Sequence, residues 1–314
     1  MSTNPINLAA SVRQRLLTLA KARQDDFQYV LTQYALERLL YRLSRSEVPE
    51  RFVLKGALLF TLWIDEPHRR TRDLDLLGTG DPSAERLVLL FQELCMLDVE
   101  ADGLTFDAGS VVAKPIREEN IYGGIRVTLR AFLDKARIPL QIDVGFGDAV
   151  MPAPTVITYP TLLEFPAPSL RAYAQETVIA EKLSALVALD MDNSRMKDFF
   201  DLWTLAKRFS FEGKSLGAAI SATFERRGMS IPASTPVGLT EVFSGNPTKQ
   251  TQWRAFLRQS VSLPQQALML EEVISLLAIF LLPVMNALSA DGIMPGTWSP
   301  NGPWQNDEEA TQQP

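Results

Sequence analysis

The chain has 314 residues, of which 46% are hydrophobic and 22% are charged, a composition that is ordinary for a soluble globular protein. Its formal net charge of −6 argues against a protein that is basic over its whole surface, but it does not exclude a local basic face. Cys95 and His68 are the only residues of their types, so an intramolecular disulfide and a histidine-based zinc site are excluded, and we expect a reducing, cytoplasmic compartment.

In the first half of the chain, the spacing of apolar side chains predicts helices that alternate with strands. Helices are expected over residues 8–21, 27–43, 58–64 and 82–97. Strands are expected over residues 51–55, 73–77, 104–106, 121–132 and 138–144. Near the end of the second helix, we interpret Arg42 and Arg45 as part of a solvated face.

The most informative stretch joins the first two predicted strands. Gly56 and Ala57 open a tight turn, and their backbone N–H groups would lie at a helix N-terminus, where phosphate binds well. Asp73 and Asp75 lie two residues apart on the next strand, so their carboxylates share one face and repel each other unless a cation such as Mg²⁺ lies between them. Asp-x-Asp alone is more often a solvated strand edge, but the glycine turn and the nearby basic run favour nucleoside triphosphate chemistry.

That basic run lies directly before the two carboxylates. Arg69, Arg70 and Arg72 are candidates for contacts with RNA phosphates, although a charge run is usually a solvated face. We interpret His68 as a surface neighbour of the run and assign it no role.

Asp143 is the second acidic feature, because it interrupts an otherwise apolar strand. A buried carboxylate needs a partner. One alternative is a salt bridge to an arginine such as Arg126 or Arg130. The other is a role as a third carboxylate beside Asp73 and Asp75, and the pattern does not decide between them.

Prolines recur from residue 151 to residue 169 and predict a linker-like crossing between two domains. Beyond it, helices are expected over residues 175–189, 195–208, 215–226, 250–261 and 268–286. We therefore divide the chain into residues 1–160, a helical domain over 161–295, and a loose tail over 296–314 that Trp298 and Trp304 would hold. No membrane span is expected, because the most apolar stretch, 273–282, is short and is followed by Pro283.

Two helices of the second half carry charged residues of interest. Lys182 falls within the apolar stripe of its helix, so it either extends to solvent or is held inward by anionic neighbours. Arg195, Asp198 and Asp201 follow one another at three-residue spacing, which by itself is typical of a salt-bridge ladder on an exposed helix face.

Taken together, these motifs resemble the AbiEii/AbiGii-type nucleotidyltransferase toxins of the DNA polymerase β-like superfamily. The resemblance rests on four ordered blocks: Lys55-Gly56-Ala57 through Arg70-Thr71-Arg72-Asp73-Leu74-Asp75, then Asp143, then Glu176 to Leu183, then Arg195 to Leu202. It implies an α+β fold, with a nucleotidyltransferase-like mixed sheet flanked by helices and followed by a helical C-terminal domain that completes the active-site cleft.

The resemblance also implies the chemistry. A nucleotide would pass from a nucleoside triphosphate to an acceptor, most simply the 3′ end of a tRNA, with Mg²⁺ or Mn²⁺ bound by Asp73, Asp75 and, less surely matched, Asp143. Lys182 and Asp198 join Asp73 and Asp75 as catalytic residues. The remaining matched positions would bind substrate phosphates: Lys55, Gly56, Ala57, Arg70, Thr71 and Arg72. The superfamily usually has Gly-Ser or Gly-Gly where this chain has Gly56-Ala57, so a hydroxyl contact to phosphate is missing here.

Two readings of different classes follow. The first is a toxin with nucleotidyltransferase activity, neutralised by a cognate antitoxin. The second is a nucleotide-binding or protein-interaction module with little catalysis, or a transferase that modifies a protein acceptor. The retained carboxylates favour the first, and incubation with labelled triphosphates and RNA separates the two. The nucleotide, the acceptor, and the choice between Asp198 and Asp201 in the second half are not decided by the sequence.

Overall fold

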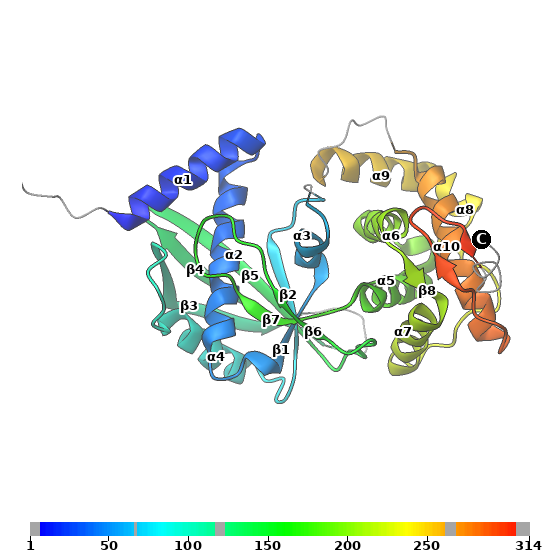
Figure 1. Cartoon of the computed structure of the whole chain (residues 1–314), viewed down its shortest axis with the longest axis horizontal. Coiled ribbons are helices and arrows are strands. Elements are labelled where there is room, and N and C mark those ends of the chain that lie inside the picture. Colours follow the sequence, from blue (N-terminus) through cyan, green and yellow to red (C-terminus); the bar gives the residue numbers. More distant parts are fainter. Residues whose placement is uncertain (1–6, 66–67, 117–122, 261–267, 306–314) are drawn as a thin grey trace, which may run out of the picture. The chain divides into compact units, whose positions relative to one another are not determined.

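The computed structural model describes residues 7–65, 68–116, 123–260 and 268–305 (Figure 1). The chain forms two compact units. The sheet unit comprises Met1–Glu66, Thr71–Gly147 and Thr155–Ala172, and the helical unit comprises Pro67–Arg70, Asp148–Pro154 and Tyr173–Pro314. The expected division after residue 160 differs from this one, because the strands that follow the prolines pair within the sheet.

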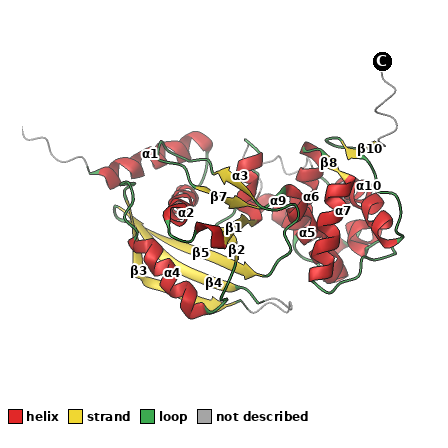
Figure 2. Cartoon of the chain, turned by 60° about the horizontal axis from the view of Figure 1, so that its bottom comes forward, coloured by secondary structure: helices red, strands yellow, loops and turns green. Residues whose placement is uncertain are grey.

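The sheet unit contains a seven-stranded mixed sheet with the order β3-β4-β5-β2-β1-β7-β6 (Figure 2). Its strands are β1 (Phe52–Lys55), β2 (Asp73–Gly78), β3 (Leu104–Pro115), β4 (Ile125–Leu133), β5 (Ala136–Phe146), β6 (Thr155–Thr158) and β7 (Ser169–Ala172). The pairs β2–β5 and β1–β7 are parallel and the other neighbours are antiparallel. The α+β class with a mixed sheet flanked by helices is confirmed.

Three long helices belong to the sheet unit: α1 (Leu8–Arg23), α2 (Phe27–Arg45) and α4 (Ala84–Met96). Each begins at a side-chain cap, because Asn7, Asp26 and Ser83 accept hydrogen bonds from backbone N–H groups of the first turn. Among the described residues between β1 and β2, the helical segments are a short 3₁₀ turn, Gly56–Leu59, and the four-residue helix α3 (Phe60–Trp63).

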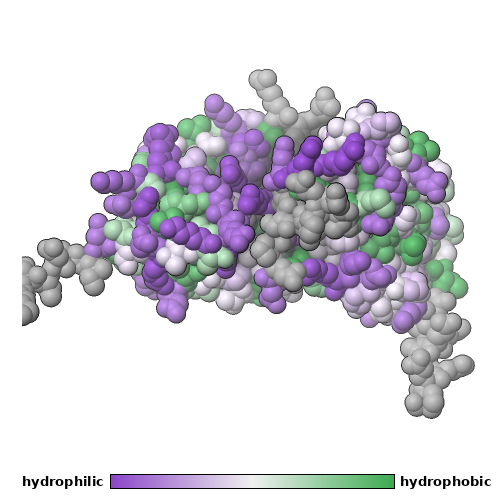
Figure 3. Space-filling model, turned by 90° about the horizontal axis from the view of Figure 1, so that it is seen from above, coloured by the Kyte–Doolittle hydropathy of each residue, from purple (hydrophilic) through white to green (hydrophobic). Residues whose placement is uncertain are grey.

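The two faces of the sheet differ in chemistry. Leu74 and Leu76 of β2 are buried, as are their neighbours Ile142 and Val144 on β5, so this face forms the core beneath the helices. On the other face, charged side chains such as Asp75, Arg126 and Asp143 are half-buried or exposed. Seen from above, the described surface is largely hydrophilic (Figure 3).

Helix α2 is buried along most of its length, including charged residues that the sequence placed in solvent. Arg42 is 6% exposed and donates to Asp102, whose side chain also accepts from Arg38. Glu37 accepts from the backbone of Leu162, and Arg38 donates to the carbonyl of Pro166. The interpretation of Arg42 as solvated was wrong, because a buried carboxylate and the proline-rich segment enclose that side of the helix.

The helical unit contains α5 (Gln175–Leu189), α6 (Met196–Arg208), α7 (Gly213–Arg226), α8 (Glu241–Ser244), α9 (Pro247–Ser260) and α10 (Leu270–Ser289). Three short strands form a small sheet: β8 (Phe211–Glu212), β9 (Thr297–Trp298) and β10 (Trp304–Gln305). The indoles of Trp298 and Trp304 donate to Ala206 and Phe280, so the first part of the expected tail is fixed to the helices, while residues 306–314 lie outside the described residues.

Helix α10 includes Pro283, as does the helix that was expected over residues 268–286. Among the described helices it is the one long and apolar enough to cross a membrane by length and composition, and 44% of its most apolar stretch is buried inside the protein. Leu277, Phe280 and Leu281 of this helix lie in the core of the helical unit, which is also typical of a soluble protein.

Candidate functional site

The paired carboxylates lie at the start of β2, in the middle of the sheet. Asp73 and Asp75 alternate with Leu74 and Leu76, so the leucines are buried in the core and the aspartates share the polar face. Both aspartates are half-buried. The alternation places two oxygen-rich side chains side by side, as the sequence predicted.

Gly56 lies against this pair. Its φ of +76° is a conformation that side-chain-bearing residues rarely adopt, and a Cβ at this position would overlap the carboxylate of Asp75. Lys55, the residue before it, is in register with Asp75 on the neighbouring strand. The glycine is therefore required twice, for its backbone conformation and for the space that Asp75 occupies. The N–H groups of Gly56 and Ala57 open a 3₁₀ turn, whereas we had expected a longer helix over 58–64.

Asp143 is in register with Asp75, on the adjacent parallel strand β5. Its carboxylate forms a bidentate salt bridge with Arg126 of β4, with Nε–Oδ1 and Nη2–Oδ2 distances of 2.8 and 2.7 Å. Of the two arginines we considered, Arg130 instead binds Asp107. Within the described ranges, no group of three or more His, Cys, Asp or Glu side chains that could hold a metal ion is assembled.

The residues flanking the carboxylates lie in different surroundings. The backbone carbonyl of Thr71 accepts from Gln33 at 2.6 Å, and Arg72 approaches Asp26 at 3.8 Å while remaining largely exposed. Arg70 is exposed. Arg70 and Arg72 are thus accessible to a large anion, whereas Thr71 is held by the second helix.

A second charged group lies within the helical unit. The ammonium of Lys182, on α5, lies 2.6 Å from Asp198 Oδ1 and 2.8 Å from Asp201 Oδ2, both on α6. Arg195 binds the other oxygen of Asp198 at 2.9 Å. The sequence left open whether Lys182 extends to solvent or is held inward by anionic neighbours, and the structure shows that it is held inward. Asp198 and Asp201 do not form an exposed salt-bridge ladder, because both carboxylates are buried.

Asp201 is the centre of this group. Besides Lys182, its carboxylate accepts from His68 Nε2 at 2.8 Å and from Arg69 Nε and Nη2 at 2.7 and 2.8 Å. The imidazole also stacks on Phe200, with ring centroids 4.8 Å apart. The interpretation of His68 as a surface neighbour was wrong, and Arg69 is engaged by a buried carboxylate, because His68 and Arg69 fold onto α6.

Burial and charge act in opposite directions on these groups. Burial would raise the pKa of Asp201, but Arg69 and Lys182 outweigh it and hold that pKa well below its ordinary value. Burial likewise opposes ionisation of Asp198, yet Lys182 and Arg195 lower its pKa. Burial would lower the pKa of Lys182, but the carboxylates of Asp198 and Asp201 outweigh burial, so this pKa is raised and the ammonium keeps its charge. Burial lowers the pKa of His68 despite the hydrogen bond to Asp201, so the imidazole is neutral near pH 7.

The group therefore carries a net charge of one positive unit, because Arg69, Lys182 and Arg195 outnumber Asp198 and Asp201. Sequence reasoning identified Lys182 and Asp198 but left Asp201 undecided. One signal for it was present in the sequence: the three-residue spacing of Asp198 and Asp201, which places both on one helix face.

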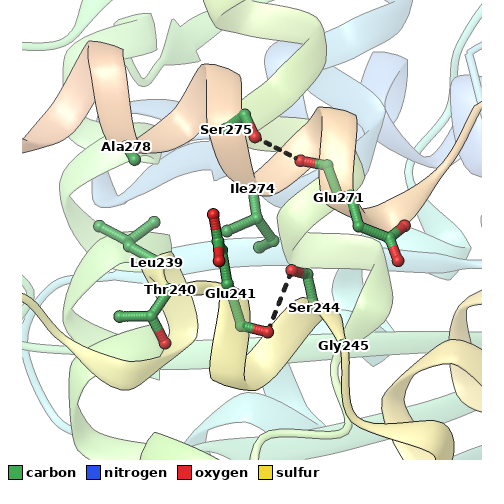
Figure 4. A pocket seen from close by; sticks show the side chains of 9 residues that line it. All are labelled: Leu239, Thr240, Glu241, Ser244, Gly245, Glu271, Ile274, Ser275 and Ala278. Carbon is green, nitrogen blue, oxygen red and sulfur yellow. Dashed lines mark hydrogen bonds between the residues drawn. The ribbon is translucent and has the colours of Figure 1, made fainter.

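A separate cavity of 590 Å³ lies elsewhere in the helical unit, between α8 and α10 (Figure 4). Its lining combines two carboxylates with hydroxyl and apolar side chains: Leu239, Thr240, Glu241, Ser244, Gly245, Glu271, Ile274, Ser275 and Ala278. None of these residues belongs to the Lys182 group, and the carboxylates of Glu241 and Glu271 in the lining disfavour a phosphate group there. We therefore treat the β2 carboxylates of the sheet unit and the Lys182 group of the helical unit as two separate candidate groups.

A known protein family matches most of the chain. The family model described as "Nucleotidyl transferase AbiEii toxin, Type IV TA system" matches residues 38–272, which is most of the chain and includes every residue of both groups. The chain belongs to the AbiEii nucleotidyltransferase toxin family. Membership implies a nucleoside triphosphate substrate and an antitoxin partner. No curated protein matches this AbiEii chain.

Two crystal structures from Helicobacter pylori resemble it. A candidate nucleotidyltransferase from that organism superposes with a TM-score of 0.50 at 17% sequence identity, over 85% of this AbiEii chain and 99% of the other chain. The protein JHP933 gives a TM-score of 0.49 at 17% identity, over 85% and 95% of the two chains. At this identity, the first likeness shows that the fold is shared.

Proposed function

We propose that this chain is a metal-dependent nucleotidyltransferase that transfers a nucleotide from a nucleoside triphosphate to an RNA acceptor, most simply the 3′ end of a tRNA. The observation that supports it best is the pair Asp73 and Asp75 on one face of β2, with Gly56 packed against Asp75. Oxygen ligands of this kind suit Mg²⁺ or Mn²⁺. Family membership supports the transferase class, and the RNA acceptor is our extension of it.

The donor set and the glycine fit such an ion. Asp73 and Asp75 would hold it, with Asp143 retained by Arg126. When bound, the ion neutralises triphosphate charge and orients the attacking hydroxyl. The backbone N–H groups of Gly56 and Ala57 are donors for a phosphate group, and they replace the hydroxyl that other superfamily members offer at the second position.

In the reaction, an acceptor hydroxyl oxygen forms a bond to the α-phosphorus and the bond to the β-phosphate oxygen breaks, so pyrophosphate leaves and the hydroxyl proton is released to solvent. Such a displacement needs positioning and charge neutralisation more than covalent help from the protein. Lys182 supplies a fixed cation for triphosphate or pyrophosphate. Asp198 holds the ammonium in place at 2.6 Å.

Arg70 and Arg72 are our candidates for phosphates of the RNA acceptor. Both are exposed, and both precede Asp73 in the chain. Contacts of this kind position a nucleic acid without reading its sequence, and they weaken as salt rises. Arg69 leaves this set, because its guanidinium is bound to Asp201. The acceptor-binding charge is thus smaller than the sequence indicated.

The test is incubation of the purified protein with each labelled nucleoside triphosphate, total RNA and Mg²⁺ or Mn²⁺. We expect labelled RNA from the wild type, and a loss of at least about 100-fold for Asp73→Asn and Asp75→Asn, since several kcal/mol of charge stabilisation disappear. Asp134→Asn is the matched control, because it removes an exposed carboxylate of the same unit at a positive φ that asparagine tolerates.

Each rival reading predicts a different result. Nucleotide binding with no labelled product, in any combination of triphosphate and metal, would favour a binding module. Label in protein instead of RNA would favour transfer to a protein acceptor. Transfer by Asp73→Asn at the wild-type rate would remove the metal assignment, whatever the acceptor.

A further inference from the structure

A row of four charged residues crosses the polar face of the sheet. In register on neighbouring strands are Lys55 of β1, Asp75 of β2, Asp143 of β5 and Arg126 of β4. Residues in register on adjacent strands point to the same face and lie about 5 Å apart. The two carboxylates are therefore neighbours at the centre of the row, and each has a cationic residue on its outer side.

Asp143 occupies the strand position that a third metal ligand would occupy, yet both of its carboxylate oxygens already have another partner. Both are bound by Arg126, at 2.8 and 2.7 Å. A bidentate guanidinium–carboxylate pair is among the stronger charge-assisted contacts and fixes the plane of the carboxylate. The Asp143 side chain is 20% exposed, so the pair is shielded from solvent on the carboxylate side.

We propose that Arg126 controls the divalent-metal site at Asp73 and Asp75 by holding Asp143 out of the ligand set. This rests on the proposed function, because it presumes that the β2 carboxylates bind the metal. With Arg126 in place, the ion has two carboxylates and a neutralised neighbour. Without Arg126, Asp143 is a third negative ligand one strand away, and the same site binds the ion more tightly.

The physical reason is competition for one pair of oxygens. A metal that recruits Asp143 must first break the salt bridge with Arg126, and the positively charged guanidinium would then lie near a divalent cation. Removing Arg126 removes both costs. Changes in the partners of metal ligands commonly alter metal affinity by about 10–100-fold, so an effect of that size is expected here. Arg126 is thus a positioning residue that acts through Asp143.

The test is a double-mutant cycle read by Mn²⁺ binding to the full-length protein, using calorimetry and the electron paramagnetic resonance signal of free Mn²⁺. We expect Arg126→Ala to lower the dissociation constant at least about tenfold. Asp143→Asn should change the wild-type affinity less than about threefold, because Asp143 is not a ligand while Arg126 holds it. The double variant Arg126→Ala with Asp143→Asn should bind as wild type does, because the gain requires Asp143.

Two controls accompany the cycle. Arg130→Ala removes an equivalent arginine from the same strand, where it binds Asp107, and should leave Mn²⁺ affinity unchanged. Arg126→Lys keeps the charge but loses the bidentate contact, and should fall between wild type and Arg126→Ala. The Arg126 side chain is 44% exposed, so its replacement should not prevent folding, which circular dichroism will verify.

The outcomes separate this inference from the proposed function. If Asp73→Asn abolishes Mn²⁺ binding but Arg126→Ala leaves it unchanged, the role of Arg126 is overturned and the metal site stands. If Asp143→Asn weakens binding as much as Asp73→Asn does, Asp143 is already a ligand and the inference is again overturned. If the wild type binds no Mn²⁺, or Asp73→Asn binds it normally, both this inference and the proposed metal site fail.

Discussion

Replacement of Asp201 by asparagine tests the charged group of the helical unit. The substitution keeps the volume and one acceptor oxygen but removes the negative charge. Asp201 is fully buried and accepts from His68, Arg69 and Lys182. Its loss would leave the two cations facing an amide, and the net charge of the group would rise from one to two positive units.

The magnitude follows from that arrangement. Removing one partner of a buried ion pair costs about 3–5 kcal/mol, because the remaining charge stays buried without compensation. For a unit of this size, each kcal/mol shifts the melting temperature by about 2–4 °C, so we expect a decrease of about 10 °C. Tryptophan fluorescence is a suitable probe, because Trp203, Trp253, Trp298 and Trp304 all lie in the helical unit.

The matched control is Asp192→Asn, which removes an exposed carboxylate from the loop just before α6 and should shift the melt by less than about 2 °C. The single imidazole gives an independent readout, because His68 must be the only histidine signal in a proton–carbon NMR spectrum. We expect that signal to titrate below its ordinary pH range in the wild type and to shift in Asp201→Asn. A melt of Asp201→Asn that matches Asp192→Asn, with an unchanged imidazole signal, would refute the central role of Asp201.

Three further predictions concern other parts of the chain. Burial raises the pKa of Glu37 to about 7, so between its unfolded value of 4.5 and 7 the folded state holds a proton that the unfolded state has lost, and the free energy of unfolding falls as pH rises. In urea titrations, the stability of Glu37→Gln should therefore rise relative to wild type by up to about 3 kcal/mol between pH 5 and pH 8. Parallel stability curves for the two proteins would contradict this. Gly56→Ala should lose about 1–2 kcal/mol of stability from its φ alone and should also weaken Mn²⁺ binding by displacing Asp75, whereas retention of full metal affinity would separate the glycine from the site. Arg69→Ala should lower the melting temperature as Asp201→Asn does. Arg70→Ala should leave the melting temperature unchanged and flatten the salt dependence of transfer to RNA. Equal effects of Arg69→Ala and Arg70→Ala on both readouts would indicate that Arg69 also binds the RNA acceptor.

The sequence alone determined the features that depend on neighbours along the chain. Apolar spacing located α1, α2, α5 and α6 to within a few residues, because that signal repeats every turn. The alternation of Asp73, Leu74, Asp75 and Leu76 determined which side chains share a face of β2, because that period is inherent in any strand. The resemblance to the AbiEii family rested on the same local motifs, and the family match confirmed it.

Tertiary structure decided every partner that is distant in sequence. Local spacing could not choose between Arg126 and Arg130 for Asp143, because both lie on the same face of β4, and the choice depends on the register between β4 and β5. Nor could it show that the proline-rich segment joins the sheet through β7, or that Arg42 is buried against Asp102. His68 and Arg69 looked like surface residues because they follow a short loop, and only the folding of that loop onto α6 brings them to Asp201, more than 130 residues away. Periodicity reports which face a side chain occupies, whereas the partner on that face is set by the strand register and helix packing that bury both groups together.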